Sequence, residues 1–136
     1  MLFRSSTGEV VGRFLAGLRD QKKIWGLRVS RQGVVVPPQS YSEADASAGG
    51  EWVEVSSVGV VTAVAEVAKP IEGLHPSSGP FAYVLVKLDG ADTAMAHVVR
   101  EGLDRLRVGC RVSAVFARDG ERRGSIHDIV GFRVTG

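Results

Sequence analysis

The chain has 136 residues, of which 44% are hydrophobic and 24% charged, a composition typical of one folded domain with a core. A net charge of only +2 argues against a protein that binds nucleic acid through a strongly basic surface. Cys110 is the only cysteine, so no internal disulfide forms, and we interpret it as a small core residue. The chain has no apolar run of membrane length and no secretion signal, so we expect a cytoplasmic protein.

The first expected element is an amphipathic helix over residues 6–21, which begins at Ser6 with the spacing of a capping box. Val10, Phe14 and Leu18 recur at the helical period and form one apolar stripe. Because so short a helix is marginal on its own, the stripe must pack either on the rest of the chain or on a partner. We therefore name these three residues as candidate partner-binding positions.

Residues 23–51 have the outline of a zinc ribbon but lack its metal ligands. Two short strands are expected at 24–29 and 33–36, followed by a Pro-Pro pair and a Ser-, Ala- and Gly-rich loop over 39–50. A structural zinc site needs four Cys or His donors, and residues 24–56 contain neither type. We expect a ribbon that keeps its shape without metal.

The remaining chain, residues 52–136, has the pattern of a small β-barrel. A glycine within its first long apolar run, Gly59, predicts a bulge or a barrel corner. The expected strands are 52–69, 81–88, 93–99, 111–117 and 126–134, with a helical turn at 101–106. Five strands with a helical turn between the third and the fourth match the OB-fold, a partly open Greek-key barrel.

This order of helix, ribbon and barrel resembles the zinc-ribbon/OB-fold family associated with acyl-CoA enzymes. In the ribbon, the cysteine positions of the family's first knuckle read as Val29 and Gln32, so the resemblance is to a member that has lost its zinc cysteines. The other segments that carry the resemblance are Phe14–Leu18, Gly33–Pro38, Ser57–Val61, Pro80–Gly90 and Leu106–Val112. It implies a mainly β fold: an N-terminal helix (1–22), a metal-free rubredoxin-like ribbon (23–51) and a five-stranded OB-fold barrel (52–136).

The resemblance also implies a function. Proteins of this family work beside thiolase-superfamily enzymes: thiolases, acyltransferases, and lipid-transfer-type aldolases that cleave steroid side-chain thioesters. It implies a non-catalytic accessory subunit, in a hetero-oligomer with such an enzyme, that stabilises its partner and shapes the substrate channel. Because the zinc ligands are missing from this chain, we expect it to hold no zinc or other cofactor of its own. It meets acyl-CoA through the complex, and the resemblance leaves open whether CoA contacts it directly.

Two groups of residues are candidates for these contacts. The large aromatic residues Trp25, Tyr41 and Trp52 flank the ribbon and are candidate partner-binding anchors, although both tryptophans could instead close the ribbon onto the barrel. The segment 71–80 is long for a hairpin connection, and long loops are often functional. Our candidate channel residues in and beside this loop are Ile71, Leu74, His75 and Phe81.

Two other classes of function fit the sequence less well than an accessory subunit. An independent enzyme is not expected, because no Ser-His-Asp spacing or carboxylate pair points to a reaction and the histidines are scattered. The alternative is a binder of single-stranded nucleic acid, which needs a basic groove with exposed aromatic side chains. Against it, Phe81, Tyr83, Phe116 and Phe132 occupy alternating apolar positions typical of a core.

Overall fold

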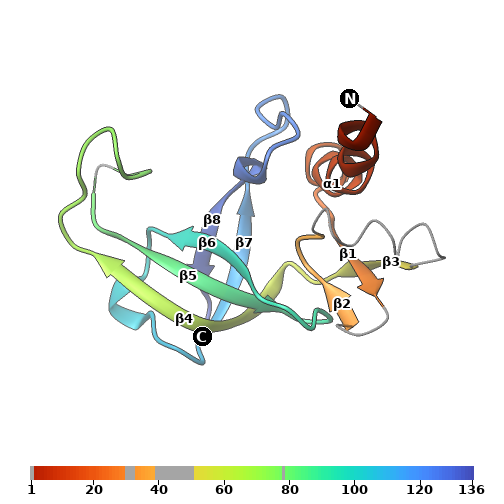
Figure 1. Ribbon diagram of the computed structural model, residues 1–136. Coiled ribbons are helices and arrows are strands. Elements are labelled where there is room, and N and C mark those ends of the chain that lie inside the picture. The colour runs from red at the N-terminus through yellow and green to blue at the C-terminus, as the bar shows by residue number, and fades with distance from the viewer. Residues whose placement is uncertain (1, 30–32, 39–50, 78) are drawn as a thin grey trace.

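The computed structural model describes residues 2–29, 33–38, 51–77 and 79–136, with side chains from Val10 onward. One helix, a small sheet and a barrel follow one another along the chain (Figure 1). The elements are α1 (Leu2–Gln21), β1 (Ile24–Val29), β2 (Gly33–Val35), β3 (Glu51–Val55), β4 (Val58–Val67), β5 (Phe81–Leu88), β6 (Met95–Val99), η2 (Leu103–Arg105), β7 (Arg111–Phe116), η3 (Ile126–Asp128) and β8 (Ile129–Val134).

Helix α1 begins at Leu2, so Ser6 lies inside the helix and the predicted start at a capping box is wrong. Residues 2–5 contain neither Gly nor Pro, and nothing in them ends the helical pattern. The helix ends where Lys22 takes a left-handed conformation, with φ 52°, which turns the chain back toward the first strand.

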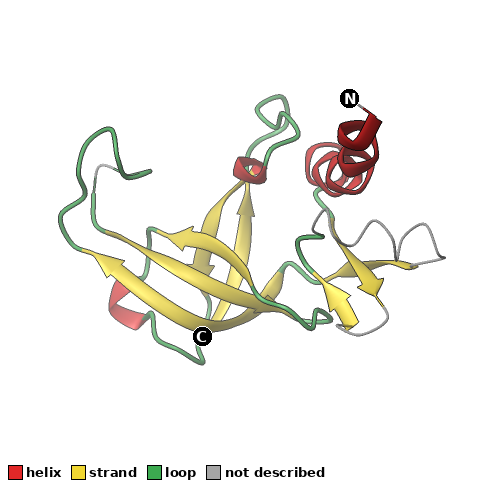
Figure 2. Cartoon of the chain, in the orientation of Figure 1, coloured by secondary structure: helices red, strands yellow, loops and turns green. Residues whose placement is uncertain are grey.

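The ribbon is a three-stranded antiparallel sheet in the order β2-β1-β3, and α1 lies beside it (Figure 2). The predicted strand 52–69 is in fact two strands, since β3 pairs with β1 and only β4 enters the barrel. Ser56 separates them: its hydroxyl accepts a hydrogen bond from the Val58 N–H, and its own N–H donates to the Asp89 carbonyl. The predicted boundary between ribbon and barrel, at residue 52, therefore falls inside β3.

The barrel is closed and has the strand order β4-β5-β6-β8-β7, which confirms the mainly β fold and the five-stranded OB-fold expected from the sequence. The bulge of β4 lies between Val61 and Ala63 and not at Gly59. Gly59 instead allows a close approach of two strands, because a Cβ there would lie 2.4 Å from the Lys87 carbonyl oxygen. The predicted last strand, 126–134, starts with the short turn η3, and only β8 is extended.

The ribbon and the barrel are joined by hydrogen bonds between β2 and the turn that follows β5. The Val34 N–H donates to the Asp92 carboxylate and the Asp92 N–H donates to the Val34 carbonyl, both at 2.8 Å. The Val36 N–H donates to the Thr93 hydroxyl, also at 2.8 Å. The β5–β6 turn thus satisfies backbone groups along the outer edge of β2, much as another strand would.

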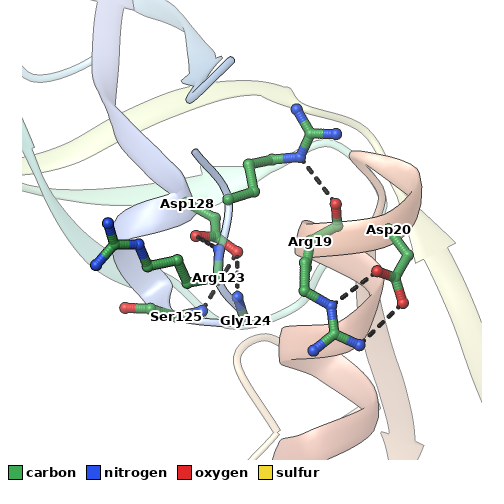
Figure 3. A network of polar contacts seen from close by, with 7 residues as sticks. Arg19, Asp20, Arg123, Gly124, Ser125 and Asp128 are labelled. Carbon is green, nitrogen blue, oxygen red and sulfur yellow. Dashed lines mark hydrogen bonds and ion pairs between the residues drawn. The ribbon is translucent and has the colours of Figure 1, made fainter. Parts of the chain in front are cut away.

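A second connection joins the end of α1 to the segment between β7 and η3 (Figure 3). The Asp128 side chain accepts hydrogen bonds from the backbone N–H groups of Arg123 and Gly124 at 2.8 Å each, which fixes the shape of this segment. From the same segment, the Arg122 guanidinium donates to the Arg19 carbonyl of the helix at 2.9 Å. The helix is therefore fastened to the barrel as well as to the ribbon.

Candidate functional site

The apolar stripe of the helix is buried inside the chain itself. Phe14 and Leu18 belong to the main core, which continues into the barrel, and Val10 belongs to a smaller cluster with residues of the ribbon. All three side chains have at most 4% of their surface exposed. Their apolar character is thus accounted for by contacts within the chain, and a partner could reach them only if α1 moved away.

The two tryptophans that flank the ribbon lie together with Arg13 of α1. The Arg13 guanidinium lies 4.8 Å from the ring centroid of Trp52 and 5.9 Å from that of Trp25. The Trp25 indole N–H also donates to the Gln21 side chain at 3.2 Å. Both indoles are half-buried, so each has a contact within the chain and a remaining exposed edge. Tyr41, the third predicted anchor, lies outside the described residues.

Trp25 also explains a glycine that weakens the helix. A Cβ on Gly17 would lie 2.4 Å from Cδ1 of the Trp25 indole, so only glycine leaves room for the ring at this turn of the helix. Glycine inside a helix lowers helix stability by about 1 kcal/mol relative to alanine. In the structure, that cost accompanies close packing of the helix on β1.

The predicted channel residues lie at the other end of the barrel, in the loop between β4 and β5 (Figure 1). Ile71 and Leu74 are 58% and 68% exposed. The loop is held by the Ile71 N–H, which donates to the His75 imidazole at 2.8 Å, and by the Ile71 carbonyl, which accepts from the backbone of Leu74 and His75. Phe81 is fully buried beneath the His75 ring, so it supports the loop from inside and offers no surface to a channel.

Beside this loop, a cavity of about 240 Å³ opens on the outer face of β5, β6 and β8, and we call it the outer cleft. The β4–β5 loop and η3 flank it. Its lining residues are Pro76, Tyr83, Ala96, His97, Val98, Arg100, Ile126, His127 and Val130. Sequence reasoning missed this cleft, although one signal was available: the outward positions of β5 include Tyr83 and Leu85, which are apolar where solvent-facing positions are usually polar.

Two polar side chains of the outer cleft, His97 and Arg100, are engaged within the chain. The His97 ring accepts from the Val98 N–H at 2.9 Å through Nδ1, lies 3.3 Å from the Ile126 carbonyl through Nε2, and packs edge-on against Phe132. Burial lowers the pKa of His97, more than the hydrogen bond to Ile126 raises it. The Arg100 guanidinium donates to the carbonyls of Val130 and Pro76, which ties the β4–β5 loop to β8.

Asp128, the buried carboxylate near the cleft, has a structural role. Burial acts to raise its pKa, but hydrogen bonds from the N–H groups of Arg123, Gly124 and Ser125 outweigh burial, and the pKa lies below its ordinary value. Together with Ser125 it forms a capping box on η3. The carboxylate therefore accepts hydrogen bonds from backbone N–H groups, which favour its ionised form. In that form it has no proton to donate.

Within the described part of the chain, no three His, Cys, Asp or Glu side chains come together as a metal site would require. In the same residues, no helix is long and apolar enough to cross a bilayer. The site residues predicted from the sequence therefore fall into two separate groups: the helix and tryptophans beside the ribbon, and the exposed loop beside the outer cleft.

Comparison with known proteins supports the family resemblance drawn from the sequence. Residues 52–117 match the family model of the C-terminal OB-fold domain of ChsH2. No curated protein sequence matches the chain.

Two solved structures share the fold over nearly the whole chain. A chain of the Ltp2-ChsH2(DUF35) aldolase has a TM-score of 0.57 and 15% identity, covering 90% of this chain and 93% of its own length. A DUF35-family protein of unknown function from Sulfolobus solfataricus has a TM-score of 0.57 and 19% identity, covering 94% of this chain and 83% of its own. The likeness thus extends beyond the barrel to the helix and the ribbon.

Proposed function

We propose that this chain is a non-catalytic accessory subunit of a thiolase-superfamily enzyme that acts on acyl-CoA thioesters. The observation that carries the proposal is the match of residues 52–117 to the OB-fold domain of ChsH2. The similar fold of the chain in the Ltp2-ChsH2(DUF35) aldolase adds support, because that protein pairs such a fold with an aldolase. A lipid-transfer-type aldolase is accordingly the first partner to test.

The described residues favour a supporting role over catalysis. An acyl-transfer or carbon–carbon bond cleavage site needs a nucleophile or base beside donors that stabilise an oxyanion. Three polar side chains in or near the outer cleft hold the protein's own backbone instead: His97 and Arg100 bond to carbonyls, and Asp128 bonds to N–H groups. We therefore assign the chemistry to the partner and positioning to this chain.

The ribbon has a source of order that requires neither metal nor partner. Residues 24–56 contain no Cys or His, and the hydrogen bonds from β2 to the β5–β6 turn, together with the helix, hold the sheet in place. A zinc-free subunit is consistent with this arrangement. In the proposed complex, the exposed edges of the Trp25 and Trp52 indoles are available for further contacts.

The test is co-expression with the lipid-transfer-type thiolase homologue of the same organism. We expect one species that contains both chains in size-exclusion chromatography with light scattering, and acyl-CoA turnover by the complex but not by this chain alone. Separate elution of the two proteins at micromolar concentration would refute the proposal. So would turnover by the isolated chain. A nucleic-acid binder would instead co-purify with material absorbing at 260 nm and bind with a steep salt dependence.

A further inference from the structure

The outer face of the barrel is apolar where a free-standing barrel would be polar. Antiparallel strands that face water usually alternate between apolar inward and polar outward residues. On β5, β6 and β8, the outward residues Tyr83, Leu85 and Val130 are each more than 40% exposed, and Ala96 lies opposite Leu85 in the β5–β6 pairing. We call these four residues the outer apolar face: Tyr83, Ala96 and Val130 line the outer cleft, and Leu85 lies beside Ala96.

The location of this face in the fold is that of a binding surface. OB-folds bind their ligands on the second and third strands, flanked by the loop between the first two strands and the loop between the last two. Here those elements are β5 and β6, the β4–β5 loop and the segment that ends in η3, and they are the elements that line the outer cleft. Nucleic-acid binders present several aromatic side chains on this surface. This chain presents Tyr83 there, while Phe81 and Phe132 are buried.

The cleft itself suits an apolar group. Its volume of about 240 Å³ accommodates one or two side chains, and its walls include Tyr83, Ala96 and Val130. His97 and Arg100 already bond to backbone groups of this chain, so a polar ligand that used either side chain would compete with those bonds. An apolar side chain entering the cleft gains burial without that cost.

The charged side chains on the strands of this face are positive. The strands β5, β6 and β8 contain no acidic residue, and their charged residues are Lys87 and Arg133, both exposed. Arg100 follows β6 directly. Of the acidic residues next to these strands, Asp89 pairs with Arg111, Asp128 is held by backbone N–H groups, and Glu101 is exposed. A partner surface with acidic residues around an apolar centre is therefore complementary to this face.

We propose that the outer apolar face is the surface that docks the partner enzyme, which inserts an apolar side chain into the outer cleft and places carboxylates near Lys87 and Arg133. The identity of the partner rests on the function proposed above. The ribbon tryptophans lie on β1 and β3, whereas β5, β6 and β8 belong to the barrel (Figure 1), so the proposal places the interface on the barrel. The exposed residues Ile71 and Leu74 lie in the β4–β5 loop that flanks the outer cleft.

The test compares Leu85→Arg with Val108→Arg in the complete chain. Both residues are exposed and apolar, at 41% and 61%, but Leu85 lies on β5 opposite Ala96, which lines the cleft, whereas Val108 lies in the turn before β7, outside the strands of the outer apolar face. Binding to the co-expressed enzyme is measured by biolayer interferometry, and circular dichroism and thermal melting verify the fold. We expect Leu85→Arg to weaken binding at least about 30-fold, as for a central interface residue, and Val108→Arg to bind like the wild type.

A charge reversal tests the chemistry of the partner. We expect the double variant Lys87→Glu/Arg133→Glu to slow association and to reduce its dependence on salt, since rim charges act mainly on the association rate. Faster association of this variant would overturn the assignment of an acidic partner.

The remaining outcomes separate the two proposals. If the wild type binds the enzyme and Leu85→Arg binds equally well, the docking face is wrong while the accessory function stands. If the wild type binds no thiolase-fold enzyme, both proposals fail. If Leu85→Arg abolishes only self-association or only oligonucleotide binding, the face belongs to a second copy or to nucleic acid, and the docking proposal is overturned.

Discussion

The barrel and the ribbon are both small antiparallel sheets, but they solve the problem of exposed edges differently. In the barrel, closure gives each of the five strands two neighbours. The ribbon is open, and its outer strand β2 has only the residues Gly33–Val35 to pair with β1. Its free edge is occupied by the β5–β6 turn through Asp92 and Thr93. A sheet too small to be stable alone therefore depends on contacts supplied by its neighbours.

The largest expected effect comes from the helix that covers the ribbon. Leu18→Ala should lower the free energy of unfolding by about 2–5 kcal/mol, because Leu18 is fully buried and its truncation leaves a cavity. Urea denaturation measures the loss, and Val108→Ala is a matched control at an exposed apolar site. Hydrogen exchange should rise more in β1 and β3 than in β5. Equal increases in both sheets would show that ribbon and barrel open as one unit.

The edge of β2 is tested next. Asp92→Ala should destabilise the protein by about 1–3 kcal/mol, because the Val34 N–H loses its acceptor at a partly buried site. Exchange of the Val34 amide should increase while the barrel amides stay protected. Asp104→Ala is the control, since Asp104 is exposed and lies in η2, away from the ribbon. If the exchange rate of the Val34 amide did not change, the outer edge of β2 would be protected without the β5–β6 turn.

A pair of glycines in one helix offers a smaller and sharper test. Gly12→Ala should stabilise the protein by up to about 1 kcal/mol, since nothing lies within 4 Å of the added methyl group. Gly17→Ala should destabilise it by about 1 kcal/mol, because the Trp25 ring must move and the packing loss exceeds the gain in helix propensity. Tryptophan fluorescence should shift in the second variant only. Equal stabilisation by both substitutions would show that the Trp25 indole moves aside without a cost in free energy.

The smallest effect concerns pH and the barrel. Burial holds the pKa of His97 below its ordinary value of about 6.5, so the unfolded chain takes up a proton there more readily than the folded one. Stability from this group is present above that value and declines as pH falls through it toward the folded pKa. His97→Gln should flatten the change in unfolding free energy between pH 7 and 5. A slope equal to that of the wild type would contradict the assignment.

The barrel could be predicted from the sequence because alternation and turn residues are local signals. Asp89-Gly90 marks the end of β5, and that strand has the predicted bounds. The split between β3 and β4 was missed because the apolar pattern continues across it, while the break depends on the hydroxyl of Ser56 and on Asp89, a distant partner. The turn η3 was missed for a similar reason: the capping pair Ser125 and Asp128 precedes a strand instead of a long helix.

The candidate site was less predictable than the fold. The outer cleft combines residues of three strands and three connecting segments, and no single stretch of sequence contains its outline. Tyr83 shows the difficulty, since an aromatic residue in an apolar run is usually interior, yet its alternation with Ala82 and Val84 turns it outward. The loop residues Ile71 and Leu74 were singled out by loop length, and the structure places them at the surface beside this cleft.

The hydrogen bonds that hold the ribbon also determine when it can be completed during synthesis. Val34 bonds to a residue 58 positions later, and the carbonyl of Arg19 bonds to a side chain 103 positions later. Chains emerge from the ribosome N-terminus first, at about 5–20 residues per second. The helix and the first two ribbon strands therefore appear several seconds before the groups that complete them. For that interval the apolar stripe of α1 lacks the part of its packing that later residues supply.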